Sequence, residues 1–70
     1  MKNNLKVERA IKDLTQGQLA EQIKVSRQTV NAIEQGKYNP SAVLALKIAQ
    51  ILGKPVEAIF QLEDADWEDA

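Results

Sequence analysis

Apolar residues recur three and four positions apart along most of the chain, which is the spacing of one face of an α-helix. No segment shows the sustained two-residue alternation of a half-buried strand, so the pattern predicts helices throughout. The first predicted helix runs from about Asn4 to Asp13, with Leu5 and Arg9 on a face that adjoins the core. The residues expected on its core face are Val7, Ala10, Ile11 and Leu14.

Two short helices are predicted next, each beginning at a hydroxyl residue that can cap it. Thr15 and Gln18 form a capping-box pattern, in which the hydroxyl accepts from an early amide and the glutamine reaches back to the cap. This second helix should end near Ile23. Ser26 is the expected cap of a third helix, which Gly36 should end in a left-handed conformation.

A fourth and a fifth helix complete an all-α prediction. Ser41 should cap the fourth helix and Gly53 should end it. The residues that make it largely core are Leu44, Ala45, Ile48, Ala49, Ile51 and Leu52. Pro55 suits the first turn of a short fifth helix. Its apolar residues either close the core or form a dimer face, and they are Val56, Ile59, Phe60 and Leu62.

Composition limits the kinds of protein that this chain can be. Its 70 residues are enough for one domain, and a domain this small buries only about 60% of its unfolded surface. The chain contains no cysteine and no histidine, which removes disulfides, the usual zinc ligands, the thiolate nucleophile and the commonest general base. We therefore expect no enzyme activity, no metal site and no cofactor.

The longest apolar run, Ala42 to Leu46, is far shorter than the roughly 20 residues that a membrane-spanning helix needs. No signal-peptide pattern opens the sequence. Both observations predict a cytoplasmic protein that does not associate with membranes.

Charge is distributed unevenly along the chain. All nine basic residues lie within residues 1–54 together with four acidic residues, which gives this part a net charge of +5. From Pro55 onward there are six acidic residues and no basic ones, a net charge of −6. This asymmetry indicates a basic binding face and a separate acidic tail. We divide the chain into a domain over residues 1–62 and a tail over residues 63–70.

The segment from Gln16 to Gln35 has the pattern of two short helices that meet at a sharp angle. Two such helices bring their backbones close together, and Ala20 supplies the small side chain that this approach requires. The apolar residues that fit the junction are Leu19, Ile23, Val25, Val30 and Ile33.

These residues resemble the phage repressor and Cro-like (XRE) helix-turn-helix family. The matching positions in the motif are Thr15, Gln16, Leu19, Ala20, Val25 to Thr29, Ile33, Glu34, Gly36 and Lys37. The likeness continues at Tyr38 to Ser41, Leu44 to Leu46, Ile59 and Phe60. The resemblance implies a five-helix repressor-like bundle whose third helix lies in the DNA major groove while the second crosses the backbone.

The resemblance also assigns roles to individual residues. It makes Arg27, Gln28 and Asn31 base readers, with Thr29 as a weaker candidate, and their side chains suit this role. Arginine can bond guanine O6 and N7 together, and glutamine or asparagine can bond adenine N6 and N7. At about 100° per residue, the first three share the helix side opposite the inward Val30 and Ile33. The expected phosphate contacts are Gln16, Ser26, Lys37 and Tyr38.

Three further residues stand out beside this resemblance. Arg9 and Glu34 resemble a pair in the family that ties the first helix to the end of the third, a structural role. Lys24 departs from the family, which usually has glycine in this turn, and a left-handed lysine there would cost about 1 to 2 kcal/mol.

The sequence leaves two functional hypotheses. The first is a transcriptional regulator, a repressor that binds a palindromic double-stranded operator as a homodimer. The second is an antitoxin-like module that binds a protein partner through its acidic tail, in which Trp67 is flanked by acidic residues. The tail can equally be a disordered, solubilising end.

Overall fold

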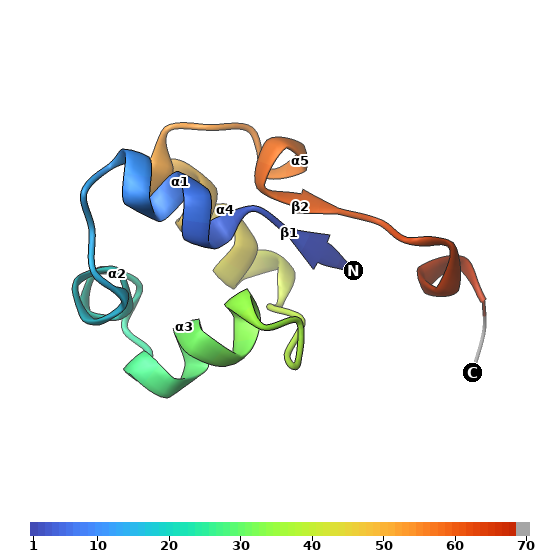
Figure 1. The fold of residues 1–70 in the computed structure, drawn as a ribbon, viewed down its shortest axis with the longest axis horizontal. Helices are drawn as coiled ribbons and strands as arrows, with labels where there is room; N and C mark the ends of the chain where they lie inside the picture. Colours follow the sequence, from blue (N-terminus) through green and yellow to red (C-terminus); the bar gives the residue numbers. More distant parts are fainter. Residues whose placement is uncertain (69–70) are drawn as a thin grey trace.

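The computed structural model describes residues 1–68 and contains five α-helices, a two-stranded sheet and a 3₁₀ turn (Figure 1). In chain order the elements are β1 (Lys2–Asn3), α1 (Leu5–Ile11), α2 (Gln16–Ile23), α3 (Arg27–Glu34), α4 (Ala42–Leu52), α5 (Val56–Ile59), β2 (Phe60–Gln61) and η1 (Asp64–Trp67). The five-helix bundle is confirmed, and the small sheet is an addition to the all-α prediction.

Hydroxyl caps set the beginnings of α2, α3 and α4 where the sequence predicts them. Thr15 Oγ1 accepts from the Gln18 amide at 3.0 Å, and the Thr15 amide donates to Gln18 Oε1 at 2.9 Å, which completes the capping box. Ser26 and Ser41 cap α3 and α4 in the same way. Each cap satisfies an amide that has no partner within its helix.

One cluster of buried side chains forms the core, and every helix contributes to it. Its members are Leu5, Leu19, Ala20, Ile23, Val30, Ile33, Leu44, Ile48, Ala49, Leu52, Ile59 and Phe60. Ile59 and Phe60 are buried within the subunit, and Val56 packs against the same cluster. Of the two alternatives for Ile59 and Phe60, closure of the core is therefore confirmed and the dimer face is wrong, because both side chains are buried within their own chain. Leu62 is exposed.

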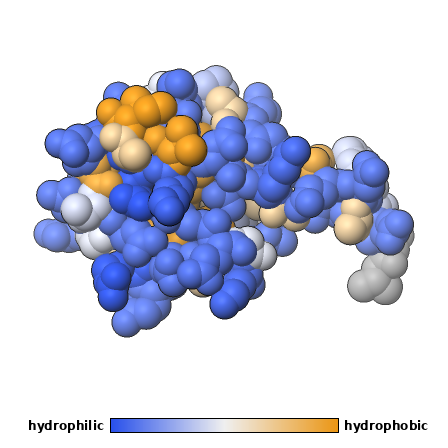
Figure 2. Space-filling model, in the orientation of Figure 1, coloured by the Kyte–Doolittle hydropathy of each residue, from blue (hydrophilic) through white to orange (hydrophobic). Residues whose placement is uncertain are grey.

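The predicted core face of α1 is wrong at three of its four positions, since of that set Leu14 alone packs against the core. Val7 and Ile11 are 59% and 64% exposed, and Ala10 is exposed as well, whereas Leu5 is completely buried. The helix is turned because Leu5 fills the core while Arg9, one turn later, is held by residues beneath the helix. Figure 2 shows the resulting hydrophobic patch over the region that α1 occupies in Figure 1.

A two-residue ladder joins the two ends of the domain. β1 and β2 are antiparallel, with Lys2 opposite Gln61 and Asn3 opposite Phe60. The Asn3 side chain also donates to the carbonyl of Ile33 at 2.8 Å, which fastens the strand to the end of α3. Strands of two residues are too short to show an alternating pattern, which explains why the sequence predicts only helices.

The turn between α2 and α3 has the left-handed backbone that the family comparison suggests. Lys24 has φ 62° and ψ 46°, and Asp13, before α2, has φ 56°. The amide of Val25 then donates to the carbonyl of Ala20 at 3.0 Å, which closes the end of α2. This turn sets the angle at which α3 leaves α2, although neither residue is the glycine that the conformation favours.

Candidate nucleic-acid interface

Helix α3 lies along the lower edge of the molecule in Figure 1, with its lower side uncovered. Val30 and Ile33 on its inner side are buried, which fixes the helix to the core. Arg27, Gln28 and Asn31 on the outer side are exposed. The same region in Figure 2 is hydrophilic. The predicted base readers therefore share one open surface on a helix that the core holds in place.

Arg9 from α1 and Glu34 from the end of α3 form a bidentate ion pair. Arg9 Nε and Nη2 donate to the two carboxylate oxygens of Glu34 at 2.8 and 3.3 Å, and Nη1 donates to the carbonyl of Leu14 at 2.8 Å. The Glu34 side chain is only 5% exposed. A pair with this geometry and burial holds the carboxylate of Glu34 in one position.

That carboxylate in turn orients Gln16, the first residue of α2. Gln16 Nε2 donates to Glu34 Oε1 at 3.0 Å and to Asn31 Oδ1 at 3.2 Å. An ionised carboxylate can only accept hydrogen bonds, so the NH₂ group of Gln16, and not its oxygen, must face Glu34. The second proton of the same NH₂ group then points at Asn31, which must present its oxygen.

Asn31 is therefore held in one orientation on the outer side of α3. Its Oδ1 also accepts from Gln35 Nε2 at 3.3 Å, so two donors engage the oxygen. The Nδ2 group remains for a ligand, and it offers two donors and no acceptor. Although the sequence analysis does not select Gln35, it is exposed and lies seven residues after Gln28, a spacing that returns to the same helix face.

A shallow groove of about 440 Å³ runs along the other side of α3. Its lining residues are Val25, Gln28, Thr29, Ala32, Tyr38 and Leu44. Gln28 is thus at the boundary between this groove and the Asn31 side. The hydroxyl of Thr29 lies 3.0 Å from that of Ser26, and Thr29 is partly buried. Thr29 and Tyr38 therefore lie at the margin of the polar face, beside the groove that Gln28 also borders.

The remaining site residues lie around this surface. Arg27 is exposed, and its stem passes the start of α2, since a Cβ added to Gly17 would lie 3.9 Å from Cδ of Arg27. Lys37 follows the left-handed Gly36 and is exposed, and its amide donates to the carbonyl of Ala32 at 2.9 Å. The two ends of α3 therefore each carry one exposed basic side chain beside the polar face.

Residues 1–68 contain no group of three or more histidine, cysteine, aspartate or glutamate side chains that could hold a metal ion. Among these residues, no helix has both the length and the apolar character needed to cross a membrane.

The angled pair α2 and α3, capped, packed and open on one side, defines a helix-turn-helix domain. The helix-turn-helix family model matches residues 5–59, which is most of the chain. This chain belongs to the helix-turn-helix family of DNA-binding transcriptional regulators.

Known proteins agree with this assignment. An uncharacterized HTH-type transcriptional regulator of Methanocaldococcus jannaschii is 56% identical over 64 residues, which cover 91% of this chain and 97% of the relative. The restriction-modification controller protein C.AhdI from Aeromonas hydrophila has a similar structure, with a TM-score of 0.73 and 34% identity over 80% of this chain and 85% of that chain. A hypothetical transcription factor from Neisseria has a TM-score of 0.73 and 29% identity over 79% of this chain, which spans only 62% of that longer one.

Proposed function

We propose that the chain regulates transcription by inserting α3 into the major groove of a specific operator, where Arg27, Gln28 and Asn31 read base edges. The observation that carries this proposal is the uncovered polar face of a helix whose opposite face is buried. A helix fits the major groove, and these side-chain types bond the edges that distinguish base pairs there. Thr29, at the margin of the face, has a secondary role.

Asn31 donates hydrogen bonds to an acceptor on a base edge, and it does not form the bidentate adenine contact that its side-chain type suggests. That contact needs a donor for N7 and an acceptor for the N6 amino group, but the Asn31 oxygen is already engaged by Gln16 and Gln35. The two N–H donors of Asn31 Nδ2 remain free for DNA, and they match the acceptors guanine O6 and N7 or thymine O4. The ion pair of Arg9 with Glu34 supports this preference through Gln16.

Phosphate contacts on both sides of α3 fix the position of the domain on the duplex. Both amide protons of the Gln16 side chain are used within the protein, so its contact comes from backbone amides at the start of α2. Ser26, Lys37 and Tyr38 complete the set. These contacts contribute affinity but no sequence preference.

The regulator acts as a homodimer on a palindromic operator, with the domain over residues 1–62 on DNA and the tail over residues 63–70 away from it. A small domain gains both affinity and specificity by pairing two reading helices about one DNA turn apart. Repression follows when such a complex covers a promoter. This function places the protein in the cytoplasm, where it meets DNA.

Selection of bound duplexes from a random pool tests the proposal. We expect enrichment of a palindrome whose half-sites are centred about 34 to 36 Å apart along the duplex. The matched control is a variant with Gln28→Ala and Arg27→Ala, which should enrich no sequence although its fold is intact by circular dichroism. If the wild-type chain also enriches no sequence, specific operator binding is excluded.

A further inference from the structure

The acidic tail contains an ordered turn that displays a tryptophan. In η1 the amide of Glu63 donates to Asp66 Oδ2 at 2.7 Å, and the amino group of Met1 lies 3.0 Å from a carboxylate oxygen of each residue. The hydrogen bond from the Glu63 amide, followed by the contact with Met1, lowers the pKa of the Asp66 carboxyl. The hydrogen bonds that the Met1 amino group donates to Asp66 and, second, to Glu63 raise the pKa of that amino group. Trp67, at the end of this turn, is 76% exposed.

An exposed tryptophan on an ordered turn is suited to binding. Indole rings bury a large apolar area and are frequent anchors of protein interfaces. Because the contacts of Met1 and Asp66 already hold the turn, little further ordering is needed when Trp67 binds. Leu62, at the base of the tail, is a second exposed apolar side chain.

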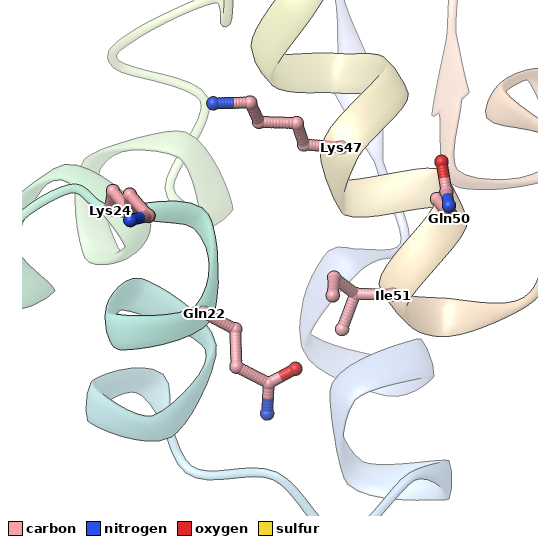
Figure 3. A pocket seen from close by; sticks show the side chains of 5 residues that line it. All are labelled: Gln22, Lys24, Lys47, Gln50 and Ile51. Atoms are coloured by element: carbon pink, nitrogen blue, oxygen red, sulfur yellow. The ribbon is translucent and has the colours of Figure 1, made fainter.

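A pocket of about 280 Å³ lies between α2 and α4 (Figure 3). Its lining residues are Gln22, Lys24, Lys47, Gln50 and Ile51. Ile51 gives an apolar surface, and the other four lining residues carry polar or charged side chains. Neither Lys24 nor Lys47 takes part in an ion pair among residues 1–68. The volume is near the lower limit of about 300 Å³ for small-molecule pockets, which is the scale of one aromatic side chain.

We propose that this pocket receives Trp67 from the tail of a second copy of the chain. The indole packs on Ile51, and the neighbouring carboxylates Asp66 and Glu68 approach the ammonium groups of Lys24 and Lys47. Charge complementarity supports this occupant, since residues 63–68 carry four carboxylates and no basic group. A lysine over the face of the indole adds a cation–π attraction.

The geometry favours a second copy over the chain's own tail. In Figure 1 η1 and α2 lie at opposite ends of the molecule, and pairing of β1 with β2 holds the chain before η1 at its own end. Two copies that exchange tails across a twofold axis fill both pockets with the same contact. None of the pocket residues is a proposed DNA contact, so this inference adds a contact between two copies that the proposed DNA-binding surface does not supply.

Trp67 is the only tryptophan in the chain, so its fluorescence reports on this contact alone. For the wild-type chain we expect a shift of the emission to shorter wavelength, and protection from acrylamide, as the protein concentration rises. Lys24→Glu with Lys47→Glu should abolish both changes. The matched control is Lys6→Glu with Lys12→Glu, an equal charge change at two exposed residues in and directly after α1, which should leave both changes in place.

Mixing two variants identifies the occupant. The chain with Lys24→Glu and Lys47→Glu keeps its tryptophan but lacks a working pocket, and Trp67→Ala has the pocket but no tryptophan. Neither should respond alone, whereas adding the second to the first should restore the shift. Trp67→Ala should also weaken self-association of the otherwise unchanged chain by roughly 30-fold, as expected for an interface anchor.

Three outcomes would overturn the proposal. A wild-type spectrum independent of concentration would exclude a second copy, and would leave the chain's own tail or a protein of different sequence as the partner. A shift that persists after both lysine substitutions would place the indole elsewhere. A mixture that shows no recovery, although both variants are folded by circular dichroism, would separate the tail from this pocket. Operator binding is measured separately, and these variants leave every proposed DNA contact unchanged, so failure of this inference is distinguishable from failure of the proposed function.

Discussion

Gln16 on α2 donates a hydrogen bond of 3.2 Å to the side-chain oxygen of Asn31 on α3. Because the same NH₂ group bonds the Glu34 carboxylate, which Arg9 holds, the contact fixes which end of the Asn31 amide faces outward. A partly buried ion pair thereby controls the hydrogen-bonding character of an exposed side chain. Residues that touch no base can therefore influence the proposed base preference.

Gln16→Ala tests this relationship. The variant keeps the backbone amide proposed to bind phosphate but removes the donor that orients Asn31, so the Asn31 amide can turn over. Discrimination at the base pair that Asn31 contacts should fall by about tenfold, the lower part of the range for a good base contact. Gel-shift titrations on the four duplexes that differ at this position measure the effect.

Gln35→Ala is the matched control for that experiment. It removes the weaker donor at 3.3 Å and leaves the bond from Gln16 in place, so discrimination should change less than in Gln16→Ala. Equal discrimination by the wild-type chain and by Gln16→Ala would show that the orientation of Asn31 does not govern base choice.

Base readers and phosphate contacts should respond differently to substitution. Arg27→Ala or Gln28→Ala should weaken binding to the selected operator by about 1 to 3 kcal/mol and relax the sequence preference. Lys37→Ala should weaken binding to all duplexes alike and reduce the slope of log K against log salt concentration by about 0.9. Titrations on the operator and on a scrambled duplex at two salt concentrations separate the two patterns. Equal losses for all three variants would refute this division of roles.

Removing one partner of the Arg9–Glu34 ion pair should destabilise the domain, whereas replacing both partners with apolar residues should change its stability little. Arg9→Met leaves the Glu34 carboxylate, only 5% exposed, without a counter-ion, which should destabilise the domain by about 3 kcal/mol in urea unfolding. Arg9→Met with Glu34→Leu removes both charges and should recover most of that loss. The double variant also releases Gln16, so it should bind DNA with the relaxed preference of Gln16→Ala. Recovery of stability with an unchanged preference would contradict the role of Glu34.

Replacing either left-handed residue, Lys24 or Asp13, with glycine should stabilise the domain, and by more where the original side chain strains the backbone more. Lys24→Gly should stabilise the domain by about 1 kcal/mol, because lysine tolerates this conformation poorly. Asp13→Gly should gain less, since aspartate visits the left-handed region more readily. Thermal unfolding at protein concentrations low enough for single copies measures both. A loss of stability in Lys24→Gly would mean that the lysine side chain contributes more than its backbone costs.

The parts of this structure that the sequence predicts are those set by local chemistry. Ser26, Ser41 and the Thr15 capping box begin helices in the structure as in the prediction, because a cap acts on residues directly after it. The outward position of Arg27 and Gln28 follows from helix periodicity in the same way. The helix-turn-helix motif lies within one continuous segment, so it can be recognised from the sequence alone.

Features that depend on distant residues could not be predicted. The face that α1 buries is decided by Leu5 and by a bond from Arg9 to a residue 25 positions later, against the apolar pattern of Val7 and Ile11. Pairing of β1 with β2 joins the two ends of the domain over only two residues each. The donor character of Asn31 requires knowledge of Gln16, which only the folded chain brings near it.

The central claim is that the outer face of α3 reads bases in the major groove, and replacement of single purines tests it most directly. Substituting 7-deazapurines in the selected operator removes the N7 acceptor, which lies in the major groove, and leaves base pairing intact. The account predicts about a tenfold loss of affinity at each purine that Arg27, Gln28 or Asn31 contacts. Unchanged affinity at every purine position, in a duplex that is still bound specifically, would contradict it.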